Sequence, residues 1–213
     1  MTEPEFGFLL RGLMWTVALS AVGFVGGGIA GLVIALLRTS GRAALERLAA
    51  GYIGVFQGTP LLMQLFVTYY GLALVGLKLT AWVSVAIGLT LHASAYLGEI
   101  WRGAIEAVPR GQSEAARALS LGYVSRMRDV VLPQALRISL PATIGFLVQL
   151  IKGTSLAAIV GFTELARAGT IISNQNFKPL TVFAVVGVLY FLLCWPLSLY
   201  GTRLERRFAA AAR

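Results

Sequence analysis

Charged side chains are scarce in this sequence. Asp, Glu, Lys and Arg together make up 13% of its 213 residues, whereas 57% are hydrophobic. A soluble domain of this size carries about 25% charged residues. The scarcity of charge therefore argues against a soluble protein and indicates that lipid surrounds most of the chain. The length suits a single domain over residues 1–213.

The sequence also lacks the groups that catalysis and cofactor binding need. Its one cysteine, Cys194, excludes an intrachain disulfide. No cluster of His, Cys and carboxylate residues has the spacing of a metal site, and no nucleophile is paired with a candidate base. A GxxxxGK[ST] loop for nucleotide phosphates is absent too. We therefore expect no catalytic residues, no metal and no nucleotide on this chain itself.

Long apolar stretches, in contrast, are abundant, and several exceed the ~20 residues that a transmembrane helix needs. We predict an all-α polytopic membrane protein with five spanning helices. The expected spans are residues 8–37, 51–75, 81–104, 138–160 and 180–200. Gly23, Gly27 and Gly31 share one face of the first span, which predicts close packing of a neighbouring helix.

Basic residues are distributed unevenly between the ends of these spans. Most of the 18 Lys and Arg residues fall in the first and third connections and in the tail, at Arg38, Arg42, Arg47, Arg102, Arg110, Arg117, Arg126, Arg128, Arg137, Arg203, Arg206, Arg207 and Arg213. The positive-inside rule makes this side cytoplasmic, with the N-terminus outside and the C-terminus inside. Since this rule also explains the net charge of +9, we expect membrane lipid around the chain and no nucleic acid.

The third connection, about residues 106–137, is long, polar and basic, with interspersed alanine and leucine. Residues 113–121 are predicted to form a short helix with Ser113 as its N-cap and Glu114 in its first turn. Gly122 is expected to supply the turn that follows. The segment is either a solvated basic connector or a docking element, the usual role of a long ordered loop.

Gly58, Thr59 and Pro60 interrupt the second span. They predict a broken helix beside a translocation pathway, because irregular backbone at membrane depth is tolerated where it lines a cavity or is buried in protein. A simple kink is the alternative. Polar residues at such depth are candidates for the pathway itself. The candidates are Thr59, Gln64, His92, Glu99, Lys152, Thr154, Ser155 and Glu164.

Each candidate also has a structural explanation. His92 suits a hydrogen-bonded packing position equally well, and Glu99 an ion pair with Arg102 three residues later. The hydroxyls of Thr154 and Ser155 either face a solute or bond back to their own helix. Lys152 is placed near the outer leaflet, in a structural or gate-lining role. Glu164, on a short outer segment, either pairs with Arg167 or contacts an external protein.

Several motifs resemble one family of transporters. Glu114-Ala115-Ala116, followed by Val130-Val131-Leu132-Pro133, resembles the EAA loop of bacterial ABC importer permeases. That family usually has glycine four residues after the second alanine, where this chain has Ser120. Further motifs resemble the histidine/glutamine/arginine-type permeases of polar amino acid importers: Gln57–Gln64, Ala95–Gly103, Val108–Gln112, Lys152–Leu156 and Thr163–Arg167. The resemblance extends over most of the chain.

The resemblance implies the type I ABC importer permease fold and a channel-forming subunit for polar amino acids in the bacterial inner membrane. It implies a cytoplasmic ABC ATPase dimer, which binds the ATP and Mg, as a partner. A second permease subunit, identical or different, and an external solute-binding protein are also implied. In the family the short helix seats in a groove of the ATPase, and this assigns coupling to Glu114, Ala115, Ala116, Arg117, Leu119, Ser120, Leu121 and Gly122.

Two other classes of membrane protein fit less well. A secondary amino acid carrier driven by an ion gradient would need buried carboxylates as ion sites, and only Glu99 is expected at such depth. Five spans are also few for such a carrier. An integral membrane enzyme would need convergent catalytic groups, which the sequence does not provide. The motifs leave open which amino acid is carried.

Overall fold

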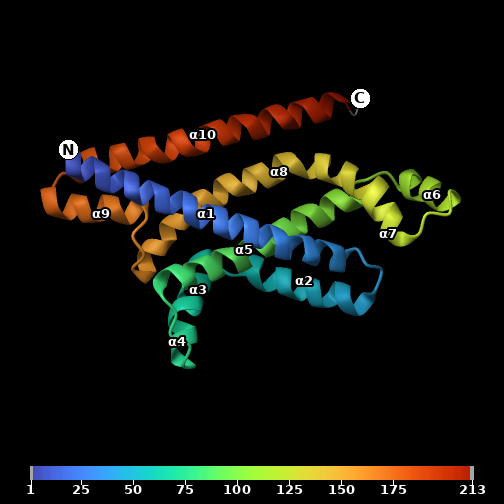
Figure 1. Cartoon of the computed structure of the whole chain (residues 1–213), viewed down its shortest axis with the longest axis horizontal. Helices are drawn as coiled ribbons and strands as arrows, with labels where there is room; N and C mark the ends of the chain where they lie inside the picture. Colours follow the sequence, from blue (N-terminus) through green and yellow to red (C-terminus); the bar gives the residue numbers. More distant parts are fainter. Residues whose placement is uncertain (1, 212–213) are drawn as a thin grey trace.

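The structure, a computed structural model that describes residues 2–211, is a bundle of long helices that run roughly along one axis (Figure 1). The longest are α1 (Glu3–Arg38), α5 (Ala81–Glu106), α8 (Leu132–Gly153) and α10 (Pro179–Ala211). Within the described residues the chain has helices and turns and no strands, which confirms the all-α prediction.

Four helical stretches are long and apolar enough to cross a membrane, namely Glu3–Arg38, Ala81–Glu106, Tyr123–Val160 and Pro179–Phe208. The remaining span consists of α2 (Ala43–Gly58) and a second part, Leu61–Leu74, which is bent away from α2 by 102°. The five predicted spans are therefore found if the bent pair counts as one. The bend is a break in the helix at Thr59 and Pro60, not a simple kink.

The fourth span begins much earlier than the predicted residue 138. A continuous helix starts at Tyr123 and includes α7 (Tyr123–Ser125), a π-helical turn (Arg126–Val131), α8 and a 3-10 segment (Thr154–Val160). The apolar repeat of this helix is hard to recognise in the sequence because charged residues lie between its members. Met127, Val131 and Ala135 recur every four residues and pack on Ala104 and Val108, so residues 123–137 are helix. The polar connection is reduced to residues 107–122.

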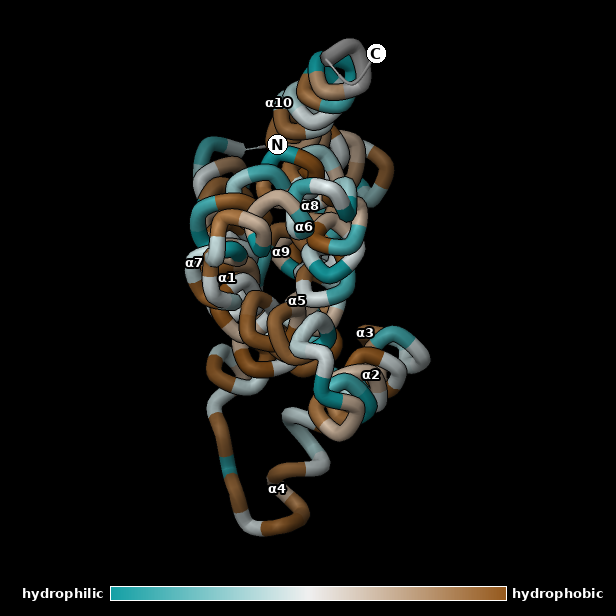
Figure 2. The backbone as a smooth tube through the Cα atoms, turned by 90° about the vertical axis from the view of Figure 1, so that its right-hand side faces the viewer, coloured by the Kyte–Doolittle hydropathy of each residue, from teal (hydrophilic) through white to brown (hydrophobic). Residues whose placement is uncertain are grey.

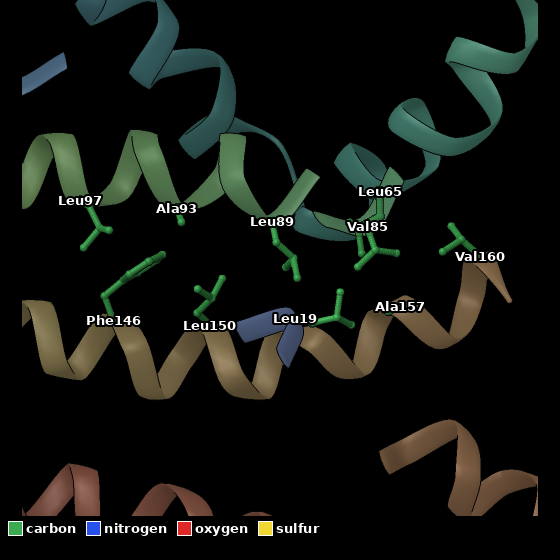
Figure 3. Packing of buried hydrophobic residues seen from close by; sticks show 10 residues of the cluster. All are labelled: Leu19, Leu65, Val85, Leu89, Ala93, Leu97, Phe146, Leu150, Ala157 and Val160. Carbon is green, nitrogen blue, oxygen red and sulfur yellow. The ribbon is translucent and has the colours of Figure 1, made fainter. Parts of the chain in front are cut away.

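The main core lies between α5 and α8. Figure 3 shows a row of α5 side chains facing α8, with Leu19 of α1 and Leu65 of α3 (Leu61–Phe66) completing the cluster. The α5 row repeats every four residues because that spacing keeps side chains on one helix face. Its members are Val85, Leu89, Ala93 and Leu97, and they meet Phe146 and Leu150 of α8. This packing fixes α8 beside the broken span.

Helix α1 packs against α5 through the predicted glycine face. Gly23, Gly27 and Gly31 are all buried. A Cβ atom on Gly23 would lie 2.9 Å from Leu89 Cβ, and one on Gly27 would collide with Ala93 Cβ. The prediction of close helix packing on this face is confirmed, because only glycine lets the two backbones approach so closely.

The two ends of the bundle differ in their helices, their turns and their arginine residues. At one end lie α6 (Arg110–Ala118), α7, the turn between α1 and α2, and the C-terminal part of α10 (Figure 1). At the other end lie the N-terminus, α9 (Leu165–Asn176) and the start of α10. The three groups of arginines predicted to share one side thus meet at the first end, here called the basic end; Arg213 lies outside the described residues.

Helix α3, a π-helical turn (Val67–Gly71) and α4 (Leu72–Leu74) form an arm that projects from the bundle in both views (Figures 1 and 2). Figure 2 shows that much of this arm is hydrophobic.

Candidate functional site

Helix α6 lies in the connection predicted to dock another protein. It begins at Arg110, directly after Pro109, and not at the predicted Ser113. Ser113 lies inside the helix and is no N-cap, which corrects the sequence prediction. Pro109 is the extended residue before the helix, with φ of −54° and ψ of 132°, and its missing N–H costs nothing because no helical carbonyl is available to it there. Without an apolar repeat, residues 110–112 gave no sign of being helical.

The C-terminal end of α6 is a Schellman motif. The Leu121 N–H donates to the carbonyl of Ala116 at 3.0 Å, and the Ser120 N–H donates to the carbonyl of Arg117 at 2.8 Å. This motif requires a left-handed residue after the helix, usually glycine. Ser120 takes that role with φ of 60°. The turn is thus at Ser120 and not at Gly122, whose φ of −64° suits any residue.

One side of α6 faces the protein and the other is free. Ala116 is buried, while Glu114, Ala115, Arg117 and Leu119 are exposed. The exposed apolar area continues onto the start of the next helix, since the side chains of Leu119 and Val124 are 75% and 74% exposed. We call Glu114, Ala115, Arg117, Leu119 and Val124, which are all exposed, the α6 surface. It combines small, charged and apolar groups at the basic end of the bundle.

A cavity of about 670 Å³ lies at the break between α2 and α3. Its walls come from the broken span, from α5 and from the end of α8. The lining residues are Gln57, Gly58, Thr59, Pro60, Leu61, His92, Tyr96, Phe146, Gln149, Leu150, Lys152, Gly153, Ser155 and Leu156. Four predicted pathway residues, Thr59, His92, Lys152 and Ser155, are thus brought to one cavity.

Gln64 lies behind this cavity and holds the break in place. The side chain is buried, and its Nε2 donates to the carbonyls of Phe56 at 2.7 Å and Thr59 at 3.0 Å and to Thr59 Oγ1 at 3.1 Å. The last carbonyls of a helix have no partner within the helix. Gln64 satisfies two of them at the end of α2, which explains how a 102° bend persists at this depth.

His92 connects Gln64 with the cavity. Its Nδ1 lies 3.1 Å from Gln64 Oε1. The imidazole also packs against Tyr96 in a tilted arrangement and stacks on Phe146, with centroid distances of 4.5 and 6.2 Å. The hydrogen-bonded packing role predicted as one alternative is therefore confirmed. His92 lines the cavity as well, so its pathway role remains a prediction.

The three polar residues around the end of α8 differ in their surroundings. Thr154 is fully buried and donates its hydroxyl to the Ile151 carbonyl at 2.7 Å. Ser155 donates to the Lys152 carbonyl at 2.8 Å and lines the cavity. Both hydroxyls thus bond back to their own helix. Lys152 is exposed to the cavity and has no carboxylate among the ion pairs of the described residues.

Glu164 is not on the outer surface, where the sequence placed it. Its side chain is fully buried and caps α9, accepting from the N–H groups of Ala166 and Arg167 at 2.9 Å each. Tyr190 of α10 donates to the same carboxylate at 2.9 Å, and Thr16 of α1 donates at 3.4 Å. The predicted Glu164–Arg167 ion pair is absent from the described residues. The guanidinium donates to the Ala158 carbonyl instead.

Glu99 forms the predicted ion pair. Arg102 Nε donates to Glu99 Oε2 at 2.8 Å, and the same guanidinium reaches Glu106. Glu99 is not among the residues that line the cavity. Glu99 lies near the end of α5 that leads to α6, in a charged network with Arg102 and Glu106. This network accounts for a carboxylate at position 99, and no contact with a solute is needed to explain it.

Sequence reasoning missed several residues of this site. Tyr96, Phe146 and Gln149 line the cavity, and none was singled out. Tyr96 lies within a motif that resembled the permeases, and Phe146 and Gln149 lie within a predicted span. Phe146 and Gln149 share one signal, the spacing of three residues that places them near Lys152 on one side of α8. Tyr96 lies one helical turn after His92 on α5.

The comparisons with known proteins agree with this architecture. A family model described as "Binding-protein-dependent transport system inner membrane component" matches residues 27–210. The probable amino-acid ABC transporter permease protein YckA of Bacillus subtilis is 36% identical, over 96% of this chain and 91% of YckA. The arginine transport system permease protein ArtQ of the same organism is 32% identical, over 97% of this chain and 94% of ArtQ.

A solved structure gives the same answer. The crystal structure of an amino acid ABC transporter with histidines has a TM-score of 0.87 and 33% identity, covering 95% of this chain and 94% of that chain. The type I ABC importer permease fold is therefore confirmed, and the secondary carrier is disfavoured. The chain is a membrane-spanning ABC transporter permease and belongs to the family of binding-protein-dependent transport system inner membrane components.

Proposed function

We propose that this chain is the translocating subunit of an ATP-driven importer that moves polar amino acids into the cytoplasm. The observation that carries the proposal is the α6 surface, which exposes charged, small and apolar residues at the basic end of the bundle. The similarity to YckA, a probable amino-acid ABC transporter permease, and to ArtQ, an arginine transport system permease, supports amino acids as the solutes.

A cytoplasmic ABC ATPase dimer is the partner that fits the α6 surface. Ala115 allows a close approach, Glu114 offers a charge to a basic partner residue, and Leu119 offers apolar area. In this arrangement the ATPase binds and hydrolyses ATP with Mg, and the present chain binds neither. It is therefore a translocation subunit and no enzyme.

The basic end of the bundle faces the cytoplasm in this proposal, because arginines gather there. The N-terminus and α9 then face the outside, where a periplasmic or extracellular solute-binding protein delivers the amino acid. A second permease subunit completes the pathway. The cavity at the α2–α3 break lies on that pathway, supported by its polar lining residues Thr59, His92, Lys152 and Ser155.

The test is reconstitution of the chain in vesicles with the ATPase and the solute-binding protein whose genes lie beside its own. Uptake is then screened with labelled amino acids. Glu114→Lys is expected to leave membrane insertion intact and to lower both ATPase association and uptake, because it reverses the charge on the docking face. Glu205→Lys is the control, since Glu205 is also exposed at the basic end but lies on α10. Full uptake by Glu114→Lys would reject the coupling role of α6.

Ala115→Trp tests the close contact itself. A bulky ring on the exposed face of α6 is expected to weaken ATPase binding more than the charge change does, because it separates the two surfaces. Ala44→Trp, on an exposed residue in the first turn of α2 at the same end, should leave binding unchanged. Equal ATPase affinity in both tryptophan variants would exclude a flush contact at Ala115.

A further inference from the structure

The amide of Gln64 has only one workable orientation. Its Nε2 faces two carbonyl oxygens, those of Phe56 and Thr59. The Thr59 hydroxyl already donates its proton to the Val55 carbonyl at 2.8 Å, so it too can only accept from Gln64. A flipped amide would set its oxygen against three acceptors with no proton between them. The amide oxygen, Oε1, must therefore face His92.

This orientation fixes the position of the proton on His92. An amide oxygen accepts hydrogen bonds and cannot donate them, so the Nδ1 atom 3.1 Å away must carry the proton. A neutral imidazole has one N–H and one lone pair. With the proton on Nδ1, the lone pair is on Nε2. The partner of one ring nitrogen thus decides what the other nitrogen offers.

The Nε2 atom is open to the cavity at the helix break. His92 lines that cavity. Within the described residues, Nε2 has no hydrogen-bond partner, and it is not one of the buried polar atoms that lack a partner. The atom is therefore accessible. The rings of Tyr96, tilted at 4.5 Å, and Phe146, stacked at 6.2 Å, pack against the imidazole and restrict its rotation. The cavity therefore contains a hydrogen-bond acceptor whose position and direction are set by the protein.

We propose, on the basis of the importer function above, that His92 Nε2 is a specificity-determining acceptor for an N–H group of the transported amino acid, and that Gln64 is the positioning residue that keeps it an acceptor. The matching groups are ammonium, amide, guanidinium or imidazole N–H. Lys152, at the same cavity and without a carboxylate partner among the described residues, suits the carboxylate of the solute. A site built to accept an N–H discriminates strongly against analogues that lack it.

The first test is spectroscopic. The chain contains a single histidine, so the difference between the ¹⁵N-histidine spectra of the assembled wild type and of His92→Gln isolates its signal. A protonated Nδ1 with a bare Nε2 is expected. In Gln64→Met, which cannot orient the ring, the two tautomers should mix. A proton on Nε2, or on both nitrogens, in the wild type would overturn the assignment.

The second test uses transport. The best amino acid from the screen is compared with analogues that each lack one N–H group. His92→Asn keeps an amide N–H for Gln64 but places nothing at Nε2, and it should raise the KM of the parent solute about 10- to 100-fold. For one analogue, the KM with the wild type should be higher than that of the parent solute by a similar factor. The KM of this analogue should not rise further in His92→Asn. His92→Gln, whose longer amide reaches the place of Nε2, should restore part of the affinity.

The outcomes separate this inference from the function on which it rests. Suppose that the wild-type assembly transports an amino acid, and that His92→Asn has the same KM as the wild type for the parent solute and for every analogue. The acceptor role is then wrong, and the importer function stands. If no amino acid is moved by the wild type, the proposed function fails, while the spectra still decide the tautomer. Membrane insertion and ATPase association of each variant exclude misfolding as the cause.

Discussion

At position 120 the backbone takes the left-handed conformation that glycine adopts without steric cost, and this chain places serine there. The cost for a residue with a Cβ is about 1–2 kcal/mol. Part of it is offset because serine has less conformational freedom to lose on folding than glycine. The C-terminal turn of α6 therefore keeps this backbone conformation at some cost in local stability.

Ser120→Gly is expected to stabilise the end of α6 by about 0.5–1 kcal/mol. This predicts that the amide protons of α6 exchange with solvent roughly two- to fivefold more slowly. Gly122→Ala is the matched control, because Gly122 has a φ of −64° and nothing within 4 Å of an added Cβ; it should not speed up exchange. Unchanged or faster exchange in Ser120→Gly would show that the serine conformation is not strained.

The buried carboxylate of Glu164 joins three helices by hydrogen bonds to α1, α9 and α10. Glu164→Ala would leave two backbone N–H groups and the Tyr190 hydroxyl without partners in a buried place. We expect a loss of about 2–4 kcal/mol, measured by thermal unfolding of the purified chain in detergent. Tyr190→Phe, which removes one of these bonds, should cost only about 1 kcal/mol.

The exposed carboxylate Glu205 provides the control for this series. Glu205→Ala is expected to change stability by less than about 0.5 kcal/mol. If Glu164→Ala and Glu205→Ala unfolded at the same temperature, the three-helix junction would contribute nothing to stability.

Among the helices, the closest approach lies between α1 and α5. Gly27→Ala is expected to destabilise the bundle by about 1–3 kcal/mol, because the added Cβ would collide with Ala93 Cβ and force the helices apart. Gly28→Ala changes the neighbouring residue in the same way, but its Cβ would meet Trp101 at an ordinary 3.5 Å. Thermal unfolding of both variants tests the difference, and equal midpoints would contradict close packing at Gly27.

The helices were predictable from the sequence to different degrees. Apolar length alone predicted α1, α5 and α10, since lipid demands an uninterrupted apolar helix. It failed at Tyr123–Arg137, where Met127, Val131 and Ala135 form the buried face of a helix that is otherwise charged. The break at Thr59 and Pro60 was predictable because proline cannot continue the hydrogen bonds of α2.

Details of the candidate site depended on contacts between distant segments, and sequence patterns do not contain these. Glu164 is buried by Thr16 and Tyr190, which lie 148 and 26 residues away along the chain. The partners of Gln64 were likewise visible only once the broken span had folded back on itself. Motif resemblance pointed to the segment that contains α6, whose coupling role stays a prediction, but it could not show that Ser120 adopts the left-handed conformation.

For the molecule as a whole, the orientation in the membrane is open to a direct test. Its one cysteine, Cys194, is buried, so Cys194→Ser gives a background without reactive thiols. In that background Ala44→Cys at the basic end is expected to react with a membrane-impermeant thiol reagent only from the cytoplasmic side. Gln175→Cys, exposed at the end of α9, should react only from outside. The reverse pattern would invert the proposed direction of transport.

The early start of the fourth span has a mechanical consequence. The helix that begins at Tyr123, next to α6, is the same helix that carries Phe146, Gln149 and Lys152 to the cavity wall. From Tyr123 to Lys152 it is about 44 Å long. A rod of that length tilted by about 5° about its α6 end would displace its far end by about 4 Å, more than the width of a water molecule. A small rotation imposed at that end would therefore suffice to change the width of the cavity.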